Sequence, residues 1–101
     1  MRLSAPVTPV MKSDSRPRPQ KHVLTQRAEE TVVLLDVESG EYYALNDVGG
    51  RVWELCDGTR SVAEIVVALI EEYDAPAASI TVDVMELLGE LTRERLLVTV
   101  D

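Results

Sequence analysis

The sequence predicts an α+β, winged-helix-like domain in which a three-stranded antiparallel sheet is followed by three helices. Up to residue 45, short runs rich in β-branched residues are separated by turn residues, as in strands. From residue 46 onward, apolar residues recur at helical spacing. Strands followed by helices are typical of α+β layouts, and 101 residues correspond to one domain with its own core.

The first 20 residues are expected to form a disordered, basic tail. Four of the five prolines of the chain lie in this segment, and it shows no strand or helix period. The folded domain is therefore predicted over residues 21–101.

Three segments are predicted to be strands. Residues 22–27 form a weak candidate, and residues 31–37 form a stronger one rich in valine and leucine. Residues 38–40, Glu-Ser-Gly, read as a tight turn, and residues 41–45 resume as a strand. Because the loop is short, the last two strands are expected to form a hairpin.

Capping residues delimit the first two predicted helices. Asn46 is a suitable N-cap, and Gly58 suits the position after the helix end. Ser61 opens the next helix, and Glu64 completes an S-x-x-E capping box.

Ser79 is predicted to cap a third helix, which runs to about Arg95. Residues 96–100 are apolar and fit either a last helical turn or a short strand.

Gly49 and Gly50 lie inside the first predicted helix, where each glycine costs about 1 kcal/mol relative to alanine. Two explanations remain open. Either another part of the chain, most simply the sheet, approaches this helix closely, or the first helical turn is loose.

The net charge of −8 is unevenly distributed. Residues 1–21 carry a net +4, whereas residues 22–101 carry five arginines and seventeen acidic residues, a net −12. An acidic body disfavours nucleic acid, so a neutral or basic partner is expected. No apolar stretch is long enough to cross a bilayer, and Cys56 has no second cysteine to pair with, which fits a cytoplasmic protein.

The sequence predicts no enzyme, no cofactor and no metal site. His22 is the only histidine and lies next to the tail, so it is a poor partner for a nucleophile. Cys56 precedes Asp57, which disfavours a thiolate. The many carboxylates fall on solvent-facing helical positions without metal-ligand spacing.

The strand over residues 41–45 is a candidate docking edge. It contains no proline or lysine, and its only charge is Glu41. Such an edge can accept an added peptide strand. The pleat puts Tyr42 and Ala44 on one face and Tyr43 and Leu45 on the other. The two tyrosines fit either the rim of a binding site or an ordinary strand.

The third predicted helix has two different flanks beside its core stripe. One flank, Asp83, Glu90 and Glu94, is expected to face solvent. The other flank is uncharged and offers a candidate wall for a binding cleft, or else it packs on a neighbouring helix. The uncharged flank consists of Thr81, Met85, Leu88 and Thr92.

Several of these segments also resemble a known family. The matching residues are Leu45-Asn46-Asp47, the run from Leu55 to Ile65 (LCDGTRSVAEI), Asp83-Val84 and Leu96-Leu97-Val98. They resemble the PqqD family of coenzyme PQQ synthesis protein D and its relatives, the RiPP precursor recognition elements, over about residues 22–100.

The resemblance implies a winged-helix-like peptide chaperone. Members of this family bind the leader of a ribosomally made precursor as a strand added to the third strand, beside the third helix. They present it to a tailoring enzyme, such as a radical S-adenosylmethionine enzyme or a peptidase. Carried over to this chain, the peptide-binding residues would be Glu41, Tyr42, Tyr43, Ala44, Leu45, Met85, Leu88 and Thr92.

Some alternatives remain open. Residues 34–43 lack the Pro-Glu pair that PqqD of the PQQ pathway tends to carry, so a lasso peptide or another modified peptide is as good a product as PQQ. The rival functions are a winged-helix DNA-binding regulator, which lacks the basic helix it would need, and an assembly subunit that dimerises through the same strand edge.

Overall fold

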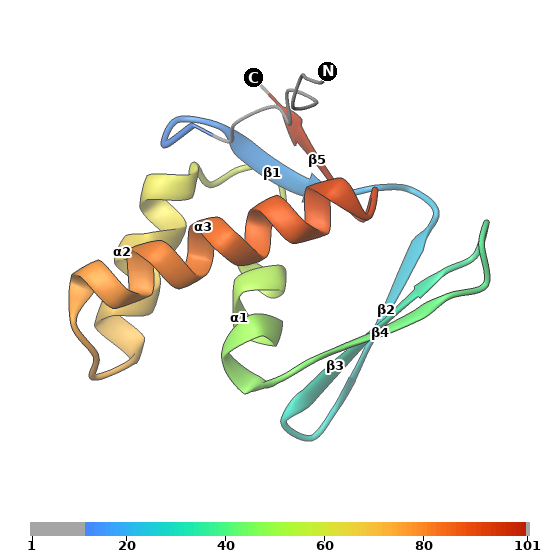
Figure 1. The fold of residues 1–101 in the computed structure, drawn as a ribbon, viewed down its shortest axis with the longest axis horizontal. Helices are drawn as coiled ribbons and strands as arrows, with labels where there is room; N and C mark the ends of the chain where they lie inside the picture. The colour runs from blue at the N-terminus through green and yellow to red at the C-terminus, as the bar shows by residue number, and fades with distance from the viewer. Residues whose placement is uncertain (1–11, 101) are drawn as a thin grey trace, which may run out of the picture.

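The computed structural model describes residues 12–100. Figure 1 shows a sheet that projects from a cluster of three helices. The elements are β1 (Arg16–Pro19), β2 (Val23–Ala28), β3 (Thr31–Asp36), β4 (Tyr42–Leu45), α1 (Asp47–Leu55), α2 (Val62–Glu72), α3 (Ala77–Arg93) and β5 (Leu97–Val100). The three predicted strands and the three helices that follow them are confirmed, and the structure adds a strand at each end.

Strands β2, β3 and β4 form an antiparallel sheet in sequential order. The β3–β4 turn is closed by Asp36, whose Oδ1 accepts hydrogen bonds from the backbone N–H groups of Glu38 and Ser39. Gly40 follows with φ of 79°, a conformation that glycine adopts without steric penalty. The predicted hairpin and its turn are therefore confirmed.

Helix α1 packs on the inner face of this sheet. Val32 and Leu34 of β3 point inward and are fully buried. A Cβ atom on Gly50 would lie 2.5 Å from Cγ2 of Val32, so only glycine permits this approach of α1 to β3. Of the two explanations for the paired glycines, close approach to the sheet is correct at Gly50.

Two of the three predicted helix caps are present. The Asn46 side chain accepts a hydrogen bond from the backbone N–H of Gly49, and Ser61 and Glu64 form the predicted capping box. The prediction of Ser79 as the third cap is wrong, because α3 begins at Ala77 and its N-cap is Pro76, three residues before Ser79. Proline offers no side-chain acceptor, so α3 has no side-chain cap.

The prediction of a disordered tail over residues 1–20 is wrong for residues 16–19. These residues form β1, which pairs antiparallel with β5. Pro17 is fully buried, and its carbonyl accepts a hydrogen bond from the backbone N–H of Gly58. The folded part therefore begins before residue 21, and residues 1–11 of the expected tail lie outside the described residues.

The sequence left open whether the C-terminal segment is a last helical turn or a short strand, and residues 97–100 form a strand. Leu96 and Leu97 are almost completely buried in the core shared with the helices. Within residues 12–100, none of the helices combines the length and apolarity that a membrane span requires.

Candidate functional site

One edge of the sheet, β4, has backbone groups without a partner. The backbone N–H of Asp36 donates to the Glu41 carbonyl, and bonded pairs alternate along an antiparallel ladder. The Tyr43 backbone therefore faces β3, whereas the backbone groups of Tyr42 and Ala44 face outward. Among the described residues, no other strand pairs with this edge.

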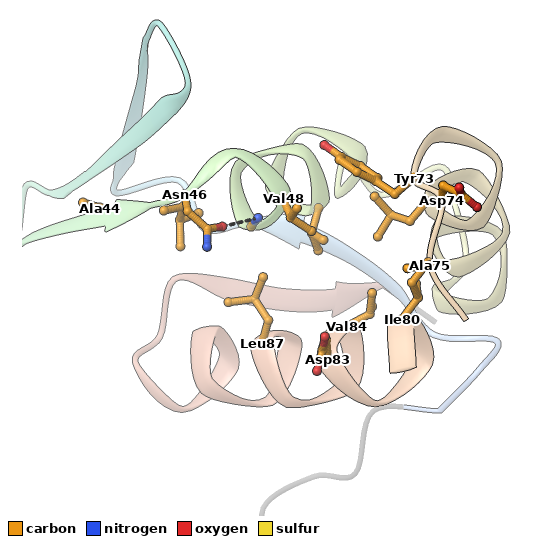
Figure 2. A pocket seen from close by; sticks show the side chains of 14 residues that line it. Ala44, Asn46, Val48, Tyr73, Asp74, Ala75, Ile80, Asp83, Val84 and Leu87 are labelled. Carbon is orange, nitrogen blue, oxygen red and sulfur yellow. Dashed lines mark hydrogen bonds between the residues drawn. The ribbon is translucent and has the colours of Figure 1, made fainter. Parts of the chain in front are cut away.

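A groove of about 680 Å³ opens where β4 runs into α1 (Figure 2). Its walls come from the end of β4, the start of α1, the end of α2 and one side of α3. Most of the lining is apolar. The lining residues are Ala44, Leu45, Asn46, Val48, Gly49, Val52, Leu69, Tyr73, Asp74, Ala75, Ile80, Asp83, Val84 and Leu87.

The start of α1 keeps this groove open. A Cβ atom on Gly49 would lie 3.2 Å from Oδ1 of Asn46 and 3.6 Å from Cδ2 of Leu87. The missing side chain thus leaves room between α1 and α3. Val48, an apolar residue at the start of α1, is 45% exposed and lines the groove.

The predicted strand residues divide between the two sheet faces as the pleat requires. Tyr42 is 71% exposed on the outer face, whereas Tyr43 and Leu45 pack against the core. Ala44 and Leu45 line the groove, and Glu41 lies at the far end of the edge.

Tyr43 connects β4 to the end of α3. Its hydroxyl lies 3.2 Å from a carboxylate oxygen of Glu94 and 3.3 Å from one of Glu41, so it can donate to either. Burial, followed by the hydrogen bond to Glu94, raises the pKa of Tyr43 to about 12. The tyrosine therefore remains a neutral donor at physiological pH and holds α3 against the strand.

The predicted helix residues do not line the groove. Leu88 is fully buried in the core, and Met85 packs against that core. The hydroxyl group of Thr92 donates a hydrogen bond to the Leu88 carbonyl. The groove is walled instead by the flank of Asp83 and Leu87. Of the uncharged flank, Leu88 and Met85 therefore pack within the domain, Thr92 is half-buried and Thr81 is exposed.

Sequence spacing did not identify several residues that line the groove: Asn46, Val48, Tyr73, Asp74 and Ala75. One signal was available: an apolar residue, Val48, directly before two glycines at the start of a helix. The rest required knowledge of which flank of α3 faces β4, and a helical period does not contain that information.

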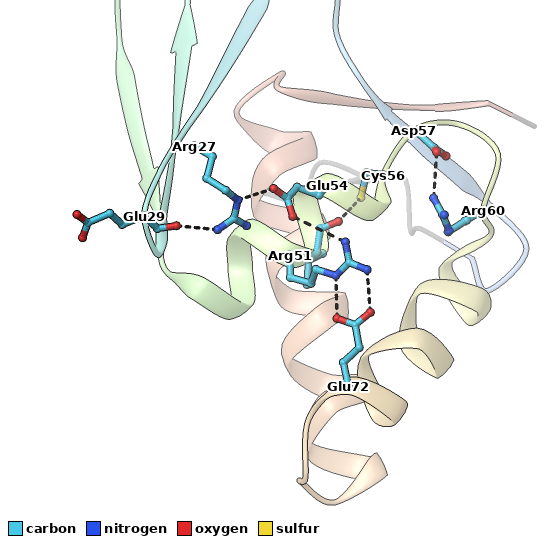
Figure 3. Close-up of polar contacts among 9 residues, drawn as sticks. Arg27, Glu29, Arg51, Glu54, Cys56, Asp57, Arg60 and Glu72 are labelled. Atoms are coloured by element: carbon cyan, nitrogen blue, oxygen red, sulfur yellow. Dashed lines mark hydrogen bonds and ion pairs between the residues drawn. The ribbon is translucent and has the colours of Figure 1, made fainter.

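The charged groups outside the groove have structural roles. The Arg27 Nε donates to Glu54 at 2.6 Å, and Arg51 forms two hydrogen bonds with Glu72, at 2.7 and 2.8 Å (Figure 3). These pairs connect α1 to β2 and to α2. Each glutamate pKa is lowered, first of all by the hydrogen bond from its arginine.

Within residues 12–100, one group of side chains could hold a metal ion: His22, Asp36 and Glu38. Each offers one potential ligand atom, and these three atoms lie within 4.8 Å of one another. Their contacts already have another role. The His22 Nε2 lies 3.1 Å from the Arg95 carbonyl, and Asp36 caps the hairpin turn. The cluster ties the start of β2 to the end of α3.

Cys56 is buried and donates to the Val52 carbonyl. Burial raises the pKa of its thiol to about 12, with Asp57 adding to the effect. This thiol is therefore protonated at physiological pH and inaccessible.

Comparison with known proteins gives a consistent result. The model of the family "Coenzyme PQQ synthesis protein D (PqqD)" matches residues 31–97. A PqqA binding protein from Xanthomonas axonopodis pv. citri (strain 306) is 43% identical over 86 residues, which cover 83% of this chain and 91% of that protein.

Two solved structures share the fold at 30% identity or more. TbiB1 in complex with the TbiA(beta) leader peptide is 30% identical, with a TM-score of 0.74, over 79% of this chain and 93% of TbiB1. The PqqD truncation of Methylobacterium extorquens PqqCD, a stand-alone RiPP recognition element, is 33% identical, with a TM-score of 0.69, over 85% of this chain and 90% of that one.

Proposed function

This chain belongs to the coenzyme PQQ synthesis protein D family, and we propose from this that it binds the leader segment of a ribosomally made precursor peptide. The leader adds to β4 as a further strand and is presented to a tailoring enzyme, and we expect this to take place in the cytoplasm. The chain acts as a binding module rather than as a catalyst.

One observation carries this proposal: the outward backbone groups of Tyr42 and Ala44 open directly onto an apolar groove. Backbone pairing supplies affinity without sequence preference, and the groove supplies selectivity by burying side chains of the added strand. At the other edge of the sheet, β2, two inward-facing side chains bind α1: Thr25 accepts a hydrogen bond from Trp53, and Arg27 donates to Glu54.

A PqqA-type leader is the first occupant to test. The similarity to PqqA binding proteins, at 43% identity, is greater than the 30% identity to TbiB1, which is in complex with the TbiA(beta) leader peptide. We therefore expect a synthetic PqqA peptide to bind more tightly than the TbiA(beta) leader. The reverse order would direct the search to precursors of the TbiA type.

The variant Ala44→Pro tests the strand edge. The N–H of Ala44 does not take part in the pairing of β4 with β3, so the fold of the variant should survive. Proline at this position removes one outward donor, and its ring blocks the approach of an added strand. We expect leader affinity to fall about tenfold or more. The measurement is a titration of labelled chain with the PqqA peptide, followed by amide shifts.

Ala44→Ser is the matched control, since it changes the same side chain and retains the N–H. It should bind the peptide like the parent chain. Equal affinity of a folded Ala44→Pro variant would rule out strand addition at β4.

A further inference from the structure

The groove carries negative charge and no positive charge in its lining. Of its fourteen lining residues, the only ionisable ones besides Tyr73 are Asp74 at the end of α2 and Asp83 on α3. In the described part of the chain, neither carboxylate forms an ion pair (Figure 2). Both are exposed, so their charge is available to a ligand.

The negative charge continues along the path of the added strand. Glu41 and Glu94 meet around the Tyr43 hydroxyl, beyond the other end of β4. By contrast, Arg27, Arg51 and Arg60 are paired with acidic residues away from the groove (Figure 3). An occupant of the groove therefore meets uncompensated carboxylates at both ends of β4.

We propose that the peptide bound in this groove places a lysine or arginine next to its apolar anchor, where Asp74 and Asp83 receive the positive charge. This inference rests on the proposed function and specifies the class of leader. In an extended strand, residues two apart lie on the same side, about 7 Å from one another. One such side chain can enter the groove while the next reaches its mouth.

The side chains of lysine and arginine suit the opening of the groove. Their apolar stems can cover Ile80 and Leu87, and their charged ends can remain in water beside Asp83. A glutamate at the same place in the peptide would face two like charges. The groove thus selects by attraction of a basic residue and by repulsion of an acidic one.

A second copy of this chain is a poorer occupant. Antiparallel pairing of two β4 edges would bring the Glu41 and Asp83 carboxylates of both copies to the same interface. Each copy carries a net charge of −8, so two copies repel one another.

The test is a selection of random twelve-residue displayed peptides on the full chain and on three variants. The first variant carries Asp74→Asn and Asp83→Asn. The second carries Glu71→Gln and Glu86→Gln, which change the net charge equally, lie on α2 and α3, and do not line the groove. The third is Ala44→Pro.

We expect peptides selected on the parent chain to be enriched in lysine or arginine within two positions of an apolar residue. The enrichment should disappear on the Asp74/Asp83 variant and persist on the Glu71/Glu86 variant. For an individual selected peptide, replacing the basic residue by glutamine should weaken binding to the parent about 3- to 10-fold at low salt and leave the Asp74/Asp83 variant unaffected.

No enrichment of basic residues, or equal enrichment on the Asp74/Asp83 variant, would overturn the charge inference alone. Selected peptides that bind Ala44→Pro as well as they bind the parent would overturn strand addition itself. A dimer of the parent chain in sedimentation equilibrium that dissociates in Ala44→Pro would identify a second copy as the occupant, and would overturn the inference too.

Discussion

Single residues set the spacing between the sheet, α1 and α3. Gly50 allows α1 to touch Val32, and Gly49 leaves the groove open beside Leu87. Neither glycine is required by a positive φ angle, because both lie within a helix. Their value is the absence of a side chain, which outweighs the low helix propensity of glycine at these two positions.

The substitution Gly50→Ala should destabilise the protein by about 1–3 kcal/mol, since the added methyl group would lie 2.5 Å from a buried valine. Gly89→Ala in α3 is the matched control, because nothing lies within 4 Å of the position of its Cβ. That variant should gain about 0.5–1 kcal/mol from helix propensity. Urea unfolding of both variants measures the difference, and a Gly50→Ala protein as stable as the parent would contradict the close contact.

At the scale of elements, β1 shows how two prolines can be accommodated in a paired strand. The Gln20 N–H donates to the Leu96 carbonyl, so bonded pairs recur at Arg18 with Val98. Pro17 and Pro19 occupy the alternate positions, whose missing N–H groups would face away from β5. The prolines therefore remove no hydrogen bond from this ladder.

Arg18→Pro should consequently weaken the β1–β5 pair, although its neighbours on both sides are already prolines. It removes a ladder donor and leaves the Val98 carbonyl without its partner, for a loss of about 1–3 kcal/mol in the free energy of unfolding. Arg18→Ala retains the N–H and should stay within about 0.5 kcal/mol of the parent. Thermal unfolding of the three proteins tests this, and identical midpoints would mean that β1 contributes nothing to stability.

At the scale of the whole molecule, the sheet separates two surfaces. Its inner face packs on α1, and its outer face carries the cross-strand row of Leu24, Leu35 and Tyr42. Leu24 is 57% exposed, and no charged residue lies on this face of the three strands. A tailoring enzyme docked there would lie next to a peptide bound along β4.

Leu24→Asp should therefore uncouple peptide binding from peptide processing. The side chain lies on β2, two strands away from the open edge, so affinity for the PqqA peptide should remain within twofold of the parent. Modification of the peptide by a reconstituted tailoring enzyme should fall about tenfold, because a charge at the centre of an apolar interface is costly. Unchanged modification by a folded Leu24→Asp variant that still binds the peptide would contradict docking on this face.

The sequence alone determined the three strands β2 to β4, the hairpin of β3 and β4, the three helices that follow them, and the caps at Asn46 and Ser61. Each of these follows from local chemistry: β-branched runs, turn residues, capping side chains and the two-residue pleat. Family resemblance added the expected mode of binding.

Only the tertiary structure decided which flank of α3 faces β4, and that residues 16–19 pair with β5. Both depend on contacts between residues far apart in the chain, such as Tyr43 with Glu94 and Pro17 with Gly58. A helical period identifies the buried stripe but treats its two flanks alike, and a proline-rich segment reads as disordered until a partner strand is found for it. The approach of α1 to α3 therefore placed Asp83 and Leu87, rather than the uncharged flank, along the groove.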